Sequence, residues 1–120
     1  MLLSFSLEER EPIWMALSEF YLDTELSSDD LVFTAKIFNN SPYNLEEIKR
    51  INKYEVYPVL YPNLLSMYGV WNGFDKTWLI ECIIARVNRQ SPIGKVILEI
   101  KYYIFSGKKI VDWEKLKKKY

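Results

Sequence analysis

The sequence predicts an all-α protein, folded as a single compact multi-helix domain over residues 1–120. Apolar residues recur at the three- and four-residue spacing of amphipathic helices, and capping signals precede most of these stretches. The composition is that of an ordinary globular chain, with 49% hydrophobic residues, 4 glycines and 5 prolines. A chain of 120 residues can bury one substantial core, so we expect one domain.

The first helix is expected to begin between Leu7 and Pro12. Ser6 and Glu9 have the spacing of a capping box, and Pro12 suits the first turn of a helix. The next apolar residues share one helical face. These residues are Ile13, Ala16, Leu17, Phe20 and Tyr21.

The second and third helices are expected on either side of a turn-rich link. The second should run from about Asp29 to Phe38, because two aspartates favour the positive N-terminal end of a helix. Asn44 and Glu47 form a capping pair for the third helix. That helix should bury Leu45, Ile48 and Ile51.

Two prolines, Pro58 and Pro62, predict an interruption after the third helix. Each would remove a backbone hydrogen bond from a helix interior, so we expect a break near residues 56–58 and a new helix to about Tyr68. Gly69 can end that helix in the left-handed conformation, and Asn72-Gly73 is a turn signal.

The last third of the chain predicts three more helices. Asp75 should cap a helix over residues 76–88, and Asp112 a short one over residues 113–119. Residues 95–105 alternate like a strand but also fit a helical stripe. Ser91-Pro92 and Gly107 favour a helix between them, and the alternative is an α+β fold with a strand near 95–105.

The composition argues against an enzyme. The chain has no histidine and a single cysteine, Cys82, so general acid/base and zinc chemistry lack their usual side chains. We interpret Cys82 as a small core residue. Glu55 and Asp75 are the carboxylate pair to test for glycoside hydrolysis, although a salt-bridged acid and a helix cap explain them more simply. We expect no metal and no cofactor.

Charge is divided between the two halves of the chain. Residues 1–56 carry 11 acids and 5 bases, and residues 57–120 carry 5 acids and 11 bases. Five of these acids fall within residues 19–30 without a single base, which exceeds what helix capping requires. They either keep the surface soluble or bind a basic partner. The candidate partner-binding residues are Glu19, Tyr21, Asp23, Glu25, Asp29, Asp30, Tyr43, Glu46 and Glu47, with Tyr21 and Tyr43 as exposed aromatic residues.

The basic C-terminal end suggests an alternative partner. Six lysines between Lys108 and Lys119 lie close in sequence to Tyr102, Tyr103 and Trp113, a combination that can bind phosphates and stack on bases. The absence of arginine from this set and the zero formal net charge argue against nucleic acid. A solvated terminal helix is the simpler interpretation.

We expect a cytoplasmic protein that does not associate with membranes. The apolar stretches are interrupted by charges well before the roughly 20 residues that a membrane span requires. The N-terminal residues lack the basic start of a secretory signal, and acids follow at Glu8, Glu9 and Glu11. A single cysteine cannot form an internal disulfide, which also favours the cytosol.

Between residues 12 and 84, five segments stand out: residues 13–18, 22–26, 55–66, 69–75 and 78–79. Together they resemble a family of small bacterial proteins. The family includes immunity proteins of contact-dependent growth inhibition and related toxin systems. The resemblance implies a cytosolic, catalytically inert protein that binds a toxin domain delivered by a neighbouring cell, with a nuclease such as a ribonuclease as the toxin. It assigns no site residue.

Overall fold

The computed structural model describes residues 6–21, 27–66, 75–89, 91–105 and 113–117, and every regular element within these ranges is helical. The all-α prediction is therefore confirmed, and the alternative with a strand near residues 95–105 is wrong. The elements are α1 (Leu7–Ser18), the 3-10 helix η1 (Glu19–Tyr21), α2 (Ser28–Asn40), α3 (Leu45–Ile51), the π-helix η2 (Asn52–Val56), α4 (Tyr57–Ser66), α5 (Lys76–Asn88), α6 (Pro92–Phe105) and α7 (Trp113–Lys117).

Local capping determines most of the helix starts. Asn44 and Glu47 form the predicted capping box of α3. The Asp75 carboxylate accepts a hydrogen bond from the Trp78 amide at 2.8 Å. The Ser91 hydroxyl accepts one from the Gly94 amide at 3.0 Å. Each cap satisfies an amide that the first turn leaves without an intrahelical partner, so these starts follow from the local sequence.

Helix α1 begins at Leu7, within the predicted range, but its first turn differs from the prediction. Ser6 is the N-cap residue, but its side chain makes no capping hydrogen bond, and Pro12 lies inside α1 rather than in its first turn. Pro12 removes only the hydrogen bond to the Glu8 carbonyl. Burial of Ile13 and Trp14 directly after the proline offsets this local cost.

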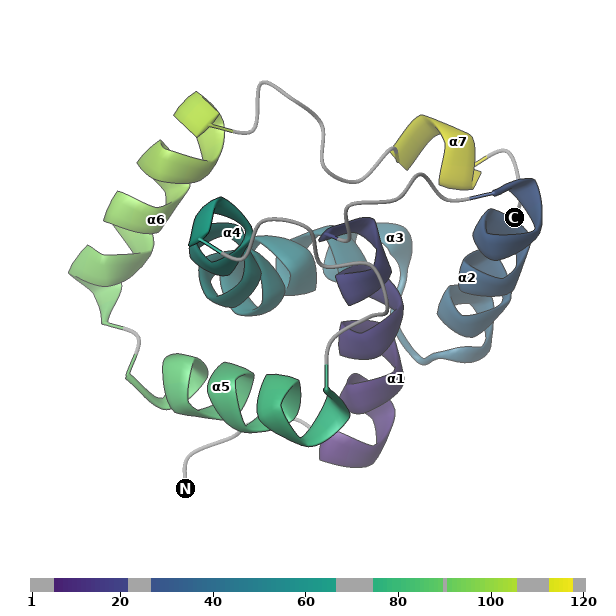
Figure 1. Cartoon of the computed structure of the whole chain (residues 1–120), viewed down its shortest axis with the longest axis horizontal. Coiled ribbons are helices and arrows are strands. Elements are labelled where there is room, and N and C mark those ends of the chain that lie inside the picture. Colours follow the sequence, from purple (N-terminus) through teal and green to yellow (C-terminus); the bar gives the residue numbers. More distant parts are fainter. Residues whose placement is uncertain (1–5, 22–26, 67–74, 90, 106–112, 118–120) are drawn as a thin grey trace.

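The predicted break near residues 56–58 is wrong, because α3, η2 and α4 form one continuous run of helix through the middle of the molecule (Figure 1). Within η2 the backbone widens, and the Tyr57 amide donates to the Asn52 carbonyl, five residues back. Pro58 has no amide hydrogen, and in an α-helix its ring would clash with the carbonyl of Tyr54. The wider π turn accommodates the proline without ending the helix.

The core surrounds this central run. Helices α1, α5 and α6 pack against η2, and α5 also packs against α4. Helix α2 packs against α1 and α7. Figure 1 places α2 and α6 at opposite ends of the longest dimension, 37 Å. None of the helices in the described ranges has the length and apolar character of a membrane span. The fully buried apolar side chains include Ile13, Trp14, Leu17, Ile48, Val56, Leu60, Leu79, Ile83 and Leu116.

Candidate functional site

Two of the predicted acidic residues, Glu19 and Asp30, lie close together near the end of α1 and the start of α2. The pKa of Glu19 is raised by partial burial of its carboxylate and by the negative charge of Asp30. Asp29 and Asp30 occupy the exposed first turn of α2. Asp30 also has a structural role, because its carboxylate and the Ser27 hydroxyl form the capping box of this helix. Asp23 and Glu25 lie outside the described residues.

The other two predicted acids, Glu46 and Glu47, belong to a different surface. They begin α3, beyond the far end of α2, and a helix of 13 residues such as α2 is about 20 Å long. Glu47 accepts a hydrogen bond from the Asn44 amide at 2.9 Å, and Glu46 pairs with Lys49 at 3.6 Å. These acids therefore stabilise the start of α3 rather than extend the acidic surface at the start of α2.

The two predicted aromatic residues are not exposed anchors. Tyr21 is 1% exposed, and its hydroxyl donates to the Asn52 side-chain oxygen at 2.6 Å. The prediction that Tyr21 is exposed is wrong because this buried partner satisfies the phenol hydroxyl. Tyr43 is half-buried, with the guanidinium carbon of Arg10 4.9 Å from the centre of its ring.

An exposed aromatic residue does lie on the acidic surface, and it is Phe33. Its side chain is 66% exposed, and it follows Asp29 by four residues and Asp30 by three, so all three share one helical face. The hydrophobic pattern of α2 contained this signal, because Leu31, Ala35 and Phe38 already fill the buried face. We call Glu19, Asp29, Asp30 and Phe33 the α2 acidic surface.

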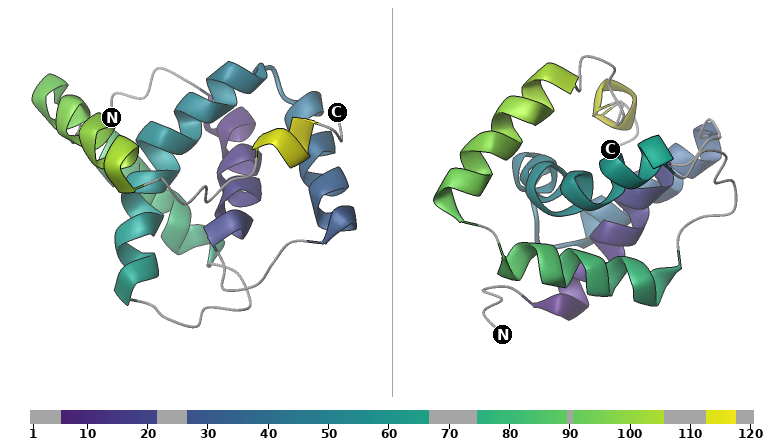
Figure 2. Two further views of the ribbon diagram at one scale, coloured as in Figure 1. Left: turned by 90° about the horizontal axis from the view of Figure 1, so that it is seen from above. Right: turned by 60° about the vertical axis from the view of Figure 1, so that its left-hand side comes forward.

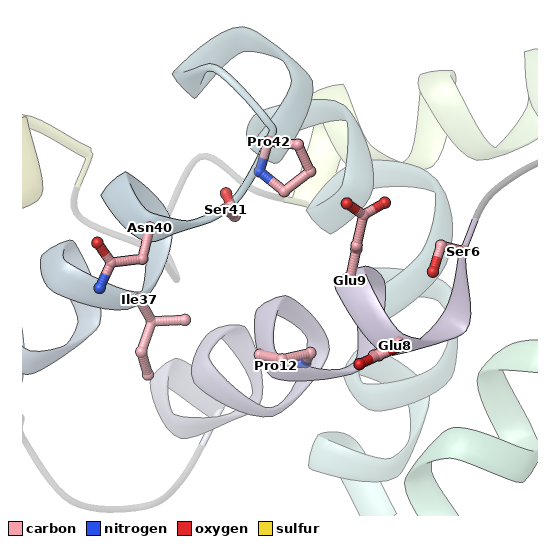
Figure 3. A pocket seen from close by; sticks show the side chains of 8 residues that line it. All are labelled: Ser6, Glu8, Glu9, Pro12, Ile37, Asn40, Ser41 and Pro42. Carbon is pink, nitrogen blue, oxygen red and sulfur yellow. The ribbon is translucent and has the colours of Figure 1, made fainter.

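A hollow of about 770 Å³ lies between the start of α1 and the end of α2 (Figure 3). Glu8 and Glu9 line one side, and the turn through Ser41 and Pro42 lines the other. Among the described residues that line it, none is basic, so a cationic group is the ligand that its charge favours. The remaining lining residues are Ser6, Pro12, Ile37 and Asn40.

The Glu55 carboxylate is largely buried and engaged in hydrogen bonds rather than exposed to solvent. Its two oxygens accept from the Arg10 guanidinium at 2.5 Å and from the Trp14 indole at 2.8 Å, and Arg10 also donates to the Tyr43 hydroxyl at 3.2 Å. Burial raises the pKa of Glu55, while Arg10 and Trp14 lower it by less. The salt-bridged acid expected at Glu55 and the helix cap expected at Asp75 are both confirmed.

Tyrosines surround Asn52, the buried polar residue of η2. Tyr21 and Tyr102 both hydrogen-bond to its side chain, which is 2% exposed. Tyr57 stacks on Tyr61, and the Tyr57 hydroxyl is buried without a hydrogen-bond partner among the described residues. Burial raises the pKa of Tyr57 to about 12 and the pKa of Tyr21 well above its ordinary 10.

We expect this tyrosine cluster to make the fold sensitive to alkaline pH. A group whose pKa is raised in the folded state contributes stability below its unfolded pKa, here 10, and loses that contribution as the pH rises towards about 12. Tyrosinate absorbance and circular dichroism should therefore change together within this range. Tyr57→Phe should move the transition to higher pH, and an unchanged transition would exclude Tyr57 as a cause.

Comparison with known proteins defines the family of this chain. Residues 8–119, nearly the whole chain, match the model of one protein family. The chain belongs to the family described as a domain of unknown function (DUF7079). No curated protein and no solved structure matches it. The DUF7079 description names no activity or partner.

Proposed function

We propose that this protein is an immunity protein, which binds a cognate bacterial toxin domain and neutralises it. The toxin is a nuclease, such as a ribonuclease, and the immunity protein contacts it through the α2 acidic surface. The observation that carries the proposal is Phe33, an aromatic side chain 66% exposed on the same helical face as Asp29 and Asp30. The resemblance of residues 12–84 to immunity proteins supports the same function.

The electrostatics of this surface favour a basic partner. A nuclease must carry positive charge where it holds phosphate, so carboxylates can occupy that site in place of the substrate. The pKa of Glu19 is raised by partial burial and by the charge of Asp30. A lysine or arginine placed between these two carboxylates would relieve their repulsion. Binding of a basic cleft therefore stabilises a cluster that is costly in the free protein.

The aromatic residue supplies the second part of the proposed mechanism. Acidic side chains attract a basic partner at long range and speed association, but exposed charges alone add little affinity. A large aromatic side chain that fills a pocket at the centre of an interface slows dissociation. Phe33 is placed for this role because Asp29 and Asp30 lie one turn away from it.

The test uses the toxin domain encoded beside this protein's gene as the binding probe. Phe33→Ala should weaken binding by about 2 kcal/mol, roughly 30-fold in the dissociation constant, mainly through faster dissociation. Asp29→Lys should slow association in a manner that depends on salt. Asp29 is preferable to Asp30 because Asp30 also caps α2. Binding is measured by surface plasmon resonance, and protection by survival of cells that express the toxin.

The matched control is Glu81→Lys, which reverses an exposed acid on α5, away from the α2 acidic surface. Glu81→Lys should change neither the association rate nor the dissociation rate of the toxin complex beyond the effect of the altered net charge. If Phe33→Ala and Asp29→Lys both leave binding and protection unchanged, the α2 acidic surface is not the binding site. If the neighbouring gene encodes no toxin domain that this protein binds, the immunity function itself is wrong.

A further inference from the structure

The outer side of α6 exposes a continuous apolar stripe. Leu98, on the opposite side of this helix, is 4% exposed and faces the core. The stripe has no charged residue within it, since Glu99 and Lys101 lie at its borders. Glu99 is held towards η2 by Tyr54 and Lys53. We call this stripe the α6 outer face: Ile93 (75% exposed), Val96 (55%), Ile97 (49%), Ile100 (54%) and Tyr103 (87%).

The spacing within the α6 outer face is that of a helix-pairing seam. Ile93 and Ile100 are seven residues apart, as are Val96 and Tyr103. Val96 follows Ile93 by three residues and precedes Ile100 by four. An apolar repeat of this kind, at alternating three- and four-residue steps, packs against the same repeat on another helix. The pattern therefore favours a helical partner over an extended peptide.

No other element in the described ranges covers the α6 outer face. The main contact of α6 is with η2, through the side that carries Leu98 and Tyr102, and Figure 2 shows α6 projecting from the rest of the molecule. With roughly 200 Å² for a fully exposed residue of this size, the stripe presents on the order of 600 Å² of mostly apolar surface. That is at the upper end of the largest patch on a typical monomer, about 300–600 Å².

We propose that two copies of this protein pair through the α6 outer face to form a homodimer. A second copy necessarily supplies a helix with the same apolar repeat, as a two-fold symmetric interface requires. Burial of the stripe on both copies removes on the order of 1,200 Å², the lower limit for a stable interface. The formal net charge of zero means that no long-range repulsion opposes self-association.

This inference does not depend on the proposed function. The α6 outer face and the α2 acidic surface lie on helices at opposite ends of the molecule (Figure 1). Pairing through α6 therefore leaves α2 accessible on both copies. A dimer that binds no toxin would support the homodimer and contradict the immunity function. A monomer that binds a toxin would do the reverse.

The experiment is sedimentation equilibrium of the full chain over a range of concentrations, with Ile100→Glu as the test variant. The wild-type protein should be dimeric. Ile100→Glu places two unpaired charges in the seam and should raise the dimer dissociation constant at least about a hundredfold. The matched control is Val32→Glu, an equivalent change at a 39% exposed position on α2, which should leave the dimer intact. Circular dichroism verifies that both variants are folded.

Cross-linking tests the geometry of the pair directly. In a Cys82→Ala chain, which has no other cysteine, Ile97→Cys introduces one thiol near the middle of the stripe. Because this position is near the middle of the stripe, the thiols of the two copies lie close together whether the helices pair in a parallel or an antiparallel manner. Mild oxidation should therefore give a covalent dimer. Val32→Cys in the same background should not.

A protein that is monomeric at every concentration would overturn the homodimer, and two further measurements would then reassign the α6 outer face. Binding to vesicles of anionic phospholipid that is lost in Ile100→Glu would make the face a membrane contact. Toxin binding that depends on Ile100 would assign the face to the toxin.

Discussion

Glu55→Ala is expected to destabilise the fold by about 3 to 5 kcal/mol, because it leaves the Arg10 guanidinium buried without its counter-charge. The Arg10 and Glu55 side chains are only 12% and 13% exposed. Their ion pair joins α1 to η2 across 45 residues of sequence. The same substitution also removes the acceptor of the Trp14 indole. The free energy of unfolding is measured by urea denaturation followed by circular dichroism.

The matched control is Glu46→Ala, which breaks a solvent-exposed pair with Lys49 and should cost less than about 1 kcal/mol. A double variant, Arg10→Met with Glu55→Met, should be less destabilised than the sum of the two single changes. Burial raises the pKa of Glu55 more than its partners lower it, so the charged carboxylate is held at a net cost. Strict additivity in this cycle would show that the two side chains do not act as a pair.

Asn52→Leu is expected to destabilise the fold by about 2 to 5 kcal/mol, because it removes the hydrogen-bond partner of two phenols at once. Tyr21 donates to the Asn52 side-chain oxygen at 2.6 Å, and Tyr102 bonds to the same amide. Each buried polar group left without a partner costs about 1 to 3 kcal/mol. Leucine has a similar volume, so the loss measures hydrogen bonding more than packing. Urea denaturation again gives the free energy.

Tyr21→Phe is the control, since it removes one hydroxyl and leaves the core shape unchanged. Alone it should cost about 1 kcal/mol. In the Asn52→Leu background it should cost nothing or be stabilising, because the hydroxyl that it removes there has already lost its partner. An equal cost in both backgrounds would contradict the proposed role of the Tyr21 to Asn52 hydrogen bond.

The parts of the fold that depend on neighbouring residues could be predicted from the sequence. The caps at Asn44, Asp75 and Ser91 require only side chains within three residues of a free amide. They place the starts of α3, α5 and α6 correctly. The continuous helix through Pro58 could not be predicted in this way. Its π turn is held by contacts of Asn52 and Glu55 with residues 31 to 45 positions away.

The candidate site was harder to predict, because exposure depends on which side of an apolar helix faces the core. Tyr21 has the helical spacing of a core residue and was nevertheless expected to be exposed. The structure buries it against Asn52, a partner remote in sequence. The α6 sequence is apolar on both sides, so periodicity alone cannot choose between Leu98 and Ile100 as the core residue. Phe33 could have been predicted as exposed, because Leu31, Ala35 and Phe38 complete the buried face of α2 without it.

The π turn also makes the number of residues between α3 and α4 a fixed quantity. An insertion or deletion in a surface connection is absorbed by the connection itself. An insertion or deletion within η2 cannot be absorbed in this way, because η2 continues directly into both neighbouring helices. Loss of one residue from within 52–56 would rotate α4 by about 100° and shift it by about 1.5 Å relative to α3. Tyr57 and Leu60 would then turn away from the core, so this segment sets the register between the two halves of the molecule.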